Sequence, residues 1–192
     1  MVQDLIKASP DPVENLTPEE MMIANISLFA PKDLIWIGKH VNHTQYPFFN
    51  PAELWLKNLP INYGTYISGS SYKTRHGSRK PINIDKNKYI IFEHDRISKD
   101  QVAQIFINNL KKGMKLVAVV DSGNKSIHGW VLNDDQGEYW RKFYLIHGFC
   151  RSAMLNNQPV RLAGGTRYFK ATENKNPTIQ KLLYLDKSLV KY

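Results

Sequence analysis

The chain is organised around residues 89–130, which read YIIFEHDRISKDQVAQIFINNLKKGMKLVAVVDSGNKSIHGW. The apolar run 89–92 predicts a short strand, and apolar residues at helical spacing, with Ser98 as a candidate N-cap, predict a helix within 98–113. Residues 116–120 predict a second, buried strand, and the alternating residues 126–130 predict a third. The stretch is therefore predicted to fold as strand, helix, strand, polar loop and strand.

Two carboxylates follow the first of these strands. Glu93 and Asp95 lie one residue apart where the strand ends, and alternate residues of a strand point to the same face, so the two side chains should project together. Mg²⁺ is bound in proteins by one or two carboxylates together with water and phosphate oxygens. The pair is a candidate site for a divalent cation, and two solvated surface acids are the alternative.

Polar residues between the second and third strands add candidate phosphate ligands. The loop 121–125 contains Ser122 and Lys125, and its backbone N–H groups can bind phosphate with the lysine as a point charge. The loop is too short for a Walker P-loop, so an ordinary turn is the alternative. Ser126 and His128 share one face of the third strand, where the histidine can hydrogen-bond a triphosphate or serve only the structure.

Two further basic segments are candidates for phosphate binding. Arg161 and Arg167 flank a Gly-Gly turn, and their planar guanidinium groups suit phosphate oxygens, with ordinary surface ion pairs as the alternative. Residues 69–80 predict a flexible loop without an acidic residue, suited to a phosphate backbone or an unpaired base. Its candidate nucleic-acid contacts are Lys73, Arg75, Arg79 and Lys80. A solvated surface loop is the alternative.

The remaining patterns predict how the rest of the chain folds. A capping box at Thr17, with Pro18 in the first turn, opens a helix that runs to about Phe29. Further elements are expected at 34–38 (strand), 50–56 (capped helix), 63–68 (strand), 139–149 (helix), 158–167 (a short strand entering a Gly-Gly turn) and 178–185 (an apolar segment). The second half then runs β-α-β followed by β-α-β, the order of an RRM-like split sheet.

The length and composition set the broader class. A chain of 192 residues with 42% hydrophobic content predicts one α/β (α+β) domain, made of a loose lead-in (1–16), an N-terminal α/β part (17–85) and an RRM-like part (86–186). The net charge of +9 suits a polyanionic partner, above all nucleic acid, although a basic surface can serve solubility alone. A single cysteine, together with the lack of an apolar signal core and of a membrane-spanning window, predicts a cytoplasmic protein.

Taken together, these segments resemble the archaeo-eukaryotic primase superfamily, particularly the primase-polymerase domains of plasmids, phages and other mobile elements. The resemblance extends from about residue 30 to 186 and is carried by 89–95, 119–130 and 158–164, with 180–185 similar to the segment that commonly follows. The most specific part is the small-x-His motif within 119–130. The resemblance implies an RRM-like catalytic half packed on a smaller N-terminal α/β half.

The resemblance also implies roles for individual residues. Glu93 and Asp95 would ligate Mg²⁺ or Mn²⁺, while Ser126, His128 and Arg161 would contact the incoming nucleotide. The implied activity is a DNA primase or polymerase, in which a 3′-hydroxyl attacks the α-phosphate of a nucleoside triphosphate on a single-stranded template. Such a protein acts in DNA replication, with a helicase fused to it or acting separately.

One position departs from the superfamily. A third metal-binding acid usually lies about eleven residues before the arginine of the last motif, and here Cys150 stands there. A thiol prefers softer metals than Mg²⁺, so the cysteine is a candidate third ligand of a different kind. Three explanations stay open: an active variant with an altered metal site, an inactive relative that still binds nucleotide or template, or an engineered substitution.

Two other functions are compatible with the residues. The first is a catalytically impaired replication module that keeps the fold and still binds nucleotide or DNA, which Cys150 and the basic loop 69–80 both suggest. The second is a metal-dependent strand-nicking enzyme, which needs paired histidines on one strand and a tyrosine nucleophile. It is the weaker of the two because the strand of His128 supplies a single histidine.

Overall fold

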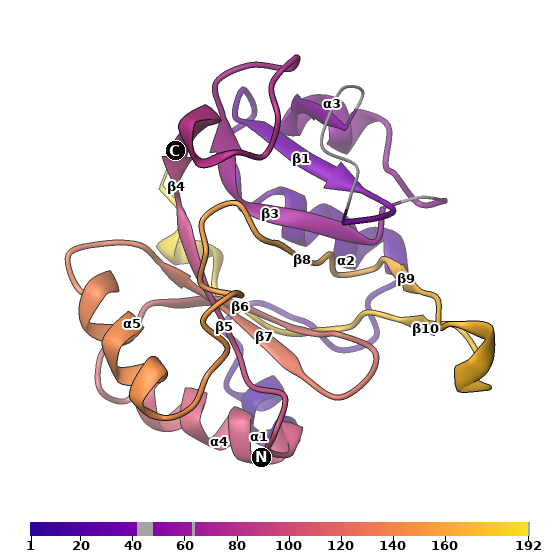
Figure 1. Ribbon diagram of the computed structural model, residues 1–192. Helices are drawn as coiled ribbons and strands as arrows, with labels where there is room; N and C mark the ends of the chain where they lie inside the picture. Colours follow the sequence, from indigo (N-terminus) through magenta and orange to yellow (C-terminus); the bar gives the residue numbers. More distant parts are fainter. Residues whose placement is uncertain (42–47, 63, 192) are drawn as a thin grey trace.

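Two antiparallel sheets form the framework of the protein (Figure 1). The computed structural model describes residues 1–41, 48–62 and 64–191. The upper sheet has the strand order β2-β1-β3-β4, and β8 also pairs with β3. Its strands are β1 (Leu34–Gly38), β2 (Phe49–Pro51), β3 (Tyr66–Tyr72), β4 (Ile84–Asn87) and β8 (Pro159–Arg161).

The lower sheet contains the stretch that the sequence singled out. Its order is β11-β6-β7-β5, and α4 connects β5 to β6. Because β5 and β6 both pair antiparallel with β7, they run parallel to each other on either side of it. The predicted strand, helix, strand, loop and strand are thus confirmed as a split βαβ unit. The elements are β5 (Tyr89–Glu93), α4 (Lys99–Leu110), β6 (Leu116–Asp121), β7 (Ile127–Leu132) and β11 (Leu182–Leu185).

Capping boxes begin two of the three helices that the sequence predicted to be capped, while the helix expected at 50–56 starts after Pro51 without a side-chain cap. Thr17 accepts a hydrogen bond from the Glu20 backbone N–H at the start of α2 (Pro18–Ile26), and the Glu20 carboxylate accepts one from Thr17 in return. Ser98 and Gln101 form the same reciprocal pair at the start of α4. Both boxes satisfy backbone donors that a helix N-terminus otherwise leaves unpaired.

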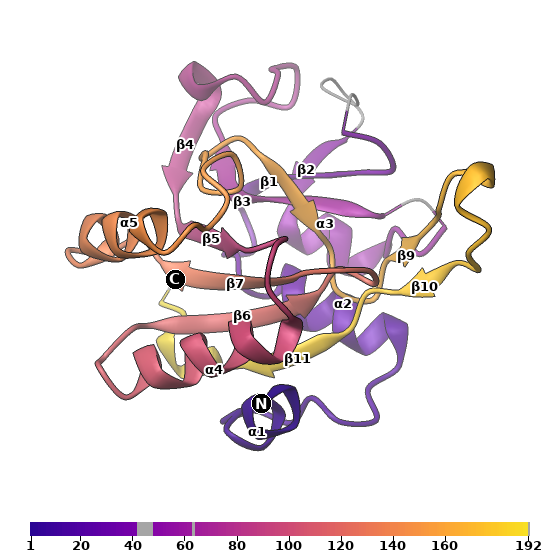
Figure 2. The same cartoon turned by 60° about the horizontal axis from the view of Figure 1, so that its bottom comes forward.

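The N-terminal segment is ordered, so the prediction of a loose lead-in over 1–16 is wrong. Helix α1 (Val2–Lys7) packs on α4 and β11 (Figure 2). Its Leu5 side chain is fully buried in the core between the lower sheet and the helices. Ser9 further accepts the backbone N–H of Leu185. Prolines 10 and 12 lie beyond the end of this helix. The helix is only about one and a half turns long, so its apolar residues give little periodic signal in the sequence.

Two predicted boundaries in the upper sheet also move. The predicted strand 63–68 begins at Tyr66 and continues through Tyr72, while Tyr63 lies outside the described residues. Serines 70 and 71 suggested a loop, but Ser70 is buried in β3, where its hydroxyl donates to the Asn156 carbonyl at 2.6 Å. The helix expected at 50–56 is α3 (Ala52–Lys57), because residues up to Pro51 belong to β2.

The end of the chain departs from the predicted second β-α-β unit. Helix α5 (Gly137–Ile146) follows β7, but β8 then pairs with β3 of the upper sheet, and β11 takes the edge of the lower sheet beside β6. The segment expected at 178–185 divides into β10 (Thr178–Ile179) and β11, and β10 pairs with β9 (Thr166–Arg167). The chain therefore crosses between the sheets where the sequence predicted a return to one sheet.

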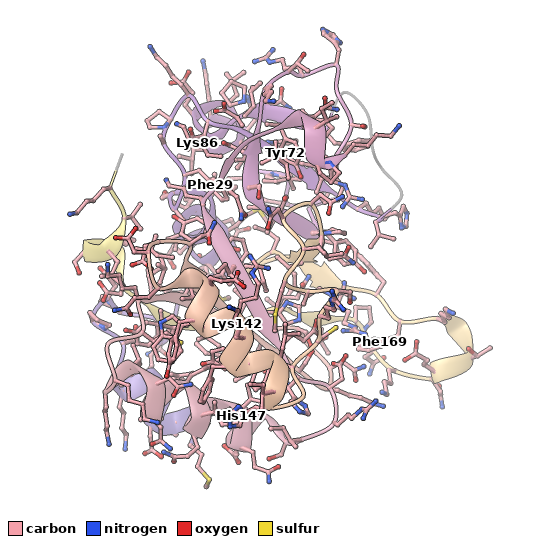
Figure 3. All side chains as sticks on the ribbon, turned by 60° about the vertical axis from the view of Figure 1, so that its left-hand side comes forward. Phe29, Tyr72, Lys86, Lys142, His147 and Phe169 are labelled. Carbon is pink, nitrogen blue, oxygen red and sulfur yellow. The ribbon has the colours of Figure 1, made fainter. Side chains whose placement is uncertain are left out.

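The two sheets share a hydrophobic core. One buried cluster joins Ile35 and Ile67 of the upper sheet to Val120 and Trp130 of the lower sheet, with Leu162 of the crossing segment. A second cluster lies between the lower sheet and helices α1, α4 and α5. Figure 3 shows α5 in front of the lower part of the molecule, with Lys142 on the helix and His147 at its C-terminal end, and Phe169 on a separate projection. Among the described residues, no helix has the length and apolarity needed to cross a membrane.

We expect Gly164→Ala to be among the most destabilising substitutions in this fold. Gly164 has φ +78°, and an added Cβ would lie 1.9 Å from the Pro18 carbonyl oxygen. Gly113 has φ +90°, but a Cβ added there would meet no heavy atom within 4 Å, so Gly113→Ala is the matched control. The left-handed conformation costs about 1 kcal/mol at either site, and overpacking adds about 1–3 kcal/mol at Gly164. Equal urea midpoints for the two variants would contradict this packing.

Candidate functional site

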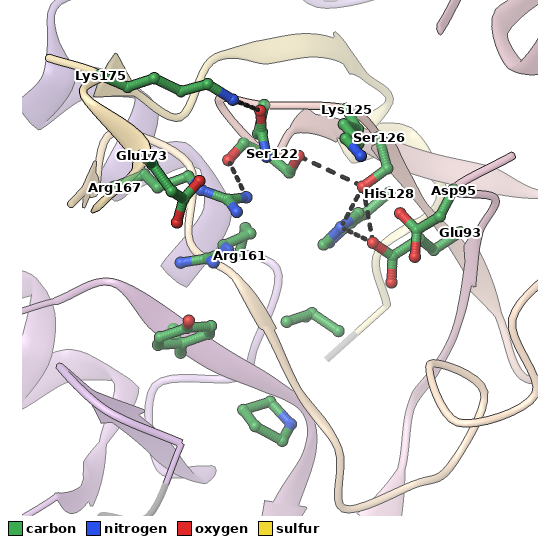
Figure 4. A pocket seen from close by; sticks show the side chains of 14 residues that line it. Glu93, Asp95, Ser122, Lys125, Ser126, His128, Arg161, Arg167, Glu173 and Lys175 are labelled. Atoms are coloured by element: carbon green, nitrogen blue, oxygen red, sulfur yellow. Dashed lines mark hydrogen bonds and ion pairs between the residues drawn. The ribbon is translucent and has the colours of Figure 1, made fainter. Parts of the chain in front are cut away.

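A pocket of about 600 Å³ lies between the two sheets and collects the residues on which the sequence prediction depended (Figure 4). Seven residues predicted for catalysis, metal binding or nucleotide binding line this pocket: Glu93, Asp95, Ser122, Lys125, Ser126, His128 and Arg161. The eighth candidate, Cys150, is not among the lining residues. Arg167 also lines it. These residues come from β5, the β6–β7 loop, β7, β8 and β9, so the crossing of β8 between the sheets brings the arginines to the acids.

Strand register explains how Glu93 meets His128. The two residues are directly opposite each other in the β5–β7 ladder, so their side chains share one face of the sheet. Ser126 lies just before the first residue of β7, and its hydroxyl reaches the same side, 3.5 Å from His128 Nε2. The loop before it is closed by a hydrogen bond from the Ser122 backbone N–H to the Ser126 carbonyl, with Gly123 at φ +72°.

Glu93 is the most constrained carboxylate of the pocket. Its Oε1 accepts hydrogen bonds from Ser126 Oγ at 2.7 Å and from His128 Nε2 at 2.9 Å. Burial alone would raise the pKa of this carboxyl, but the hydrogen bond and charge of His128, then Ser126 and Arg161, lower it to about 2. Glu93 is therefore ionised across the neutral range, and within the described residues its Oε2 accepts no hydrogen bond.

This lowered pKa predicts how acid affects stability. A carboxyl whose pKa falls from 4.5 unfolded to about 2 folded stabilises the fold fully above about pH 5, and this contribution is lost as pH falls toward 2. The shift corresponds to about 3 kcal/mol. Urea unfolding between pH 6 and pH 3 should therefore show a steeper loss of stability in the wild type than in Glu93→Gln. Parallel curves would show that Glu93 is not held ionised by its neighbours.

His128 is placed to hold Glu93 rather than to face solvent. It is 4% exposed, and because an ionised carboxylate only accepts, its Nε2 must carry the proton that it shares with Glu93. Its Nδ1 is buried without a hydrogen-bond partner among the described residues. The direct nucleotide contact implied by the resemblance stays a prediction, since Nε2 is engaged with Glu93.

Asp95 lines the same pocket from beyond the end of β5. The strand ends at Glu93, so the alternation expected of a strand does not itself position Asp95, which lies in an exposed bend. Together, the ionised Glu93 and the exposed Asp95 are hard oxygen donors that fit Mg²⁺ or Mn²⁺ bound with phosphate oxygens. Within the described ranges, no group of three or more His, Cys, Asp or Glu side chains is arranged to hold a metal ion.

Cys150 lies beside the end of β5, but its thiol is not part of the pocket. Its backbone N–H donates to the Glu93 carbonyl at 2.8 Å, and its Sγ shares a hydrogen bond of 3.0 Å with Ser152 Oγ. The residues lining the pocket do not include it. The position implied by the resemblance is therefore close to Glu93 along the backbone, while the side chain is engaged elsewhere.

The opposite wall of the pocket is cationic. Arg161 lies over the ring of Tyr66, with its guanidinium carbon 4.2 Å from the ring centroid, and burial lowers the pKa of Arg161. Arg167 donates from Nη1 to the Ser122 carbonyl at 3.3 Å, while its buried Nε has no partner in the described part of the chain. Both guanidinium groups can therefore offer donors to an anion in the pocket.

The sequence reasoning missed one contributor, the projection formed by residues 166–179, which we call the arm. It contains β9 and β10 and extends from the body of the protein (Figures 1 and 2). Thr178 Oγ1 donates to the Gly123 carbonyl at 2.8 Å, and Lys175 Nζ donates to Asn124 Oδ1 at 3.3 Å. The arm brings Glu173 and Lys175 to the pocket, although its polar composition resembled an ordinary loop.

The basic loop meets its prediction only in part. Lys73 and Lys80 are exposed and Arg75 is half-buried, but Arg79 is only 9% exposed and lies over the Trp36 ring, 4.2 Å from its centroid. Its guanidinium also donates to the carbonyls of Val41 and Asn157. Arg79 therefore fixes the loop to β1 and is not an exposed phosphate contact, because the stacking and hydrogen bonds that it makes within the protein occupy it.

Comparisons of the chain with protein-family models, with curated proteins and with solved structures found no match. The function is therefore inferred from the pocket and its chemistry.

Proposed function

We propose that the protein is a primase-polymerase-type nucleotidyltransferase that joins nucleotides on a single-stranded DNA template, in the replication of a plasmid, phage or other mobile element. The observation that carries the proposal is the meeting of Glu93, Asp95, Ser126, His128 and Arg161 in one pocket, although they come from three separate stretches of the sequence. A binding site for a nucleoside triphosphate and a divalent cation needs carboxylates for the cation and basic side chains for the phosphates in the same pocket.

The architecture gives partial support. The split βαβ unit of the lower sheet agrees with an RRM-like catalytic half, and the upper sheet agrees with a smaller α/β half packed on it. The pairing of β8 with β3 departs from a complete RRM-like order. This departure serves the site, since it carries Arg161 across to the acids of the lower sheet.

The charge of the pocket suits a nucleotide that arrives with a cation. Among the described lining residues, four cationic side chains face three carboxylates: Lys125, Arg161, Arg167 and Lys175 against Glu93, Asp95 and Glu173. Near-neutral balance would attract a bare triphosphate weakly. A bound Mg²⁺ or Mn²⁺, held by Glu93 and Asp95, would neutralise charge on the phosphates and on the attacking 3′-hydroxyl.

The chain's own residues then act by positioning. Arg161 and Arg167 would hold phosphate oxygens with paired N–H donors, and Lys125 would add an exposed point charge at the pocket mouth. Ser126 and His128 fix the rotamer of Glu93 through hydrogen bonds to Oε1. Oε2, which accepts no hydrogen bond from the described residues, would then bind the cation. Such preorganisation is what phosphoryl and nucleotidyl transfer require from a protein.

A second candidate is a replication module that binds nucleotide or DNA without catalysis. The hydrogen bond between the Cys150 thiol and Ser152 favours it, because the residue at the third acid position is engaged outside the pocket. In this case, binding of single-stranded DNA should survive Glu93→Ala and Asp95→Ala unchanged. A metal-dependent incorporation activity would exclude it.

The direct test is incorporation of labelled nucleotides on single-stranded templates with Mg²⁺ or Mn²⁺. We expect primer extension or primer synthesis by the wild type, and an increase in Cys150→Asp if a third carboxylate strengthens the cation site. Neither protein incorporating either ribonucleotides or deoxynucleotides on any template would refute the enzymatic proposal.

We expect Arg161→Ala to weaken binding of a nucleoside triphosphate by about tenfold to a hundredfold, because a charge-assisted hydrogen bond contributes about 1.5–3 kcal/mol. Arg151→Ala is the matched control, since Arg151 is exposed and does not line the pocket. Arg161→Lys should recover only part of the affinity, because it cannot bind two oxygens through a planar fork. Isothermal titration with Mn²⁺ present would measure all three. Equal affinities of Arg161→Ala and Arg151→Ala would place the phosphates elsewhere.

A further inference from the structure

A smaller cavity of about 330 Å³ adjoins the main pocket, and we call it the side pocket. Its lining consists of Lys39, His40, Thr65, Tyr66, Arg161 and Tyr168. Tyr66 and Arg161 line both cavities, so the two adjoin at these side chains. The side pocket therefore lies next to the place where the proposed nucleotide would bind.

Tyrosine rings and basic side chains make up most of this lining, which contains no carboxylate among the residues that the structure describes. Tyr168 is 60% exposed at the base of the arm, and the Lys39 ammonium lies 5.9 Å from its ring centroid. Tyr66 already has Arg161 over its ring at 4.2 Å, which leaves Tyr168 as the ring with the larger free surface. An exposed ring beside a lysine offers stacking for a base and a charge for its phosphate.

A second cavity that adjoins the main pocket lacks this combination. It has a volume of about 400 Å³, meets the main pocket at Pro159, and contains Arg79 and Lys80 of the basic loop. No aromatic side chain is among its described lining residues, and Arg79 is engaged with Trp36. Phosphate contacts alone would be available there, whereas the side pocket offers stacking as well.

We propose that the side pocket binds one unpaired nucleobase of a single-stranded nucleic acid, with Tyr168 stacked on the base and Lys39 at the adjacent phosphate. The inference rests on the proposed function, because it takes the strand to continue from the main pocket. The single-stranded nucleic acid would then contact the arm and the end of β1, whereas the sequence predicted that it contacts the basic loop.

The test is binding of a fluorescently labelled deoxythymidine oligomer of about 12 nucleotides, a length within the range that single-strand-binding folds cover. Tyr168→Ala should weaken binding about tenfold, and Tyr168→Phe should restore it, because the ring and not the hydroxyl carries the stacking. Tyr139→Ala is the matched control, since Tyr139 is 59% exposed on α5, away from both cavities. Lys39→Ala should instead reduce the salt dependence of binding.

An oligomer of the same length without bases separates stacking from a general loss of affinity. Tyr168→Ala and the wild type should bind this sugar-phosphate chain equally. The inference would be overturned if Tyr168→Ala bound the base-containing oligomer as tightly as the wild type does. It would also be overturned if Tyr168→Ala lost the same affinity for both oligomers, or if the wild type bound neither oligomer. Nucleoside triphosphate binding with Mn²⁺, measured in parallel, should be unchanged in Tyr168→Ala. Its absence from the wild type would instead refute the proposed function.

Discussion

Replacing Glu93 with glutamine is expected to lower metal-dependent nucleotide incorporation at least a hundredfold. The amide keeps the shape of the carboxylate but removes the charge that a divalent cation needs, and losses of about 10²-fold or more follow removal of such a group. The effect should be large because its neighbours hold Glu93 ionised: His128 and Ser126 lower the pKa of this carboxyl against the effect of burial.

The matched control for this substitution is Glu138→Gln. Glu138 is an exposed carboxylate on α5, 67% accessible at its side chain, and it does not line the pocket. Both variants should unfold cooperatively at neutral pH, so that a difference in incorporation reports the site and not the fold. If Glu93→Gln incorporated nucleotides at the rate of Glu138→Gln, the carboxylate would have no role in the chemistry.

Replacing His128 with alanine is expected to destabilise the protein by about 3 kcal/mol. The change leaves the Glu93 carboxylate, whose side chain is 20% exposed, with Ser126 as its remaining hydrogen-bond donor among the described residues. Losing a hydrogen bond to a charged group costs about 1.5–3 kcal/mol, and the cavity left by the buried ring adds to this loss, so the upper end is expected. Urea unfolding at neutral pH measures the loss, and the pKa of Glu93 should rise in the same variant.

A double-mutant cycle separates the pair from the packing of the ring. If His128 acts through Glu93, Glu93→Gln combined with His128→Ala should be more stable than the sum of the single effects predicts, by about 1–3 kcal/mol. His147→Ala, an exposed histidine on α5 stacked on Phe143, should change stability by less than about 0.5 kcal/mol. Strict additivity of the two site substitutions would show that the imidazole only fills space.

The parts of the fold that followed from the sequence are those with a clear local period. Strands β5 and β6 are continuous apolar runs, and the N-caps Thr17 and Ser98 were identifiable because the chemistry of capping depends on neighbours within three residues. Ser126 and His128 were expected on one face of a strand; they do lie on the same side, although β7 begins only at Ile127. The meeting of these residues with Glu93 needed the register of β5 on β7, which the sequence does not reveal by itself.

The parts that did not follow depend on contacts between distant segments. The pairing of β8 with β3 is set by residues about ninety positions apart, and Val160 fits either sheet by its hydrophobicity alone. Arg79 lies in a basic, polar segment that is typical of a surface loop, and only the structure, which places it over Trp36, shows that it is buried. The arm has no apolar period, so its contacts with Gly123 and Asn124 could not be foreseen.

The central claim is that Glu93 and Asp95 bind a divalent cation together with a nucleoside triphosphate. Electron paramagnetic resonance of Mn²⁺, titrated into the protein with and without a deoxynucleoside triphosphate, measures this binding without requiring catalysis. We expect the wild type and Glu138→Gln to bind Mn²⁺ more tightly when the nucleotide is present, and Glu93→Gln and Asp95→Asn to lose at least about tenfold in that affinity. Equal Mn²⁺ binding by all four proteins would contradict the claim.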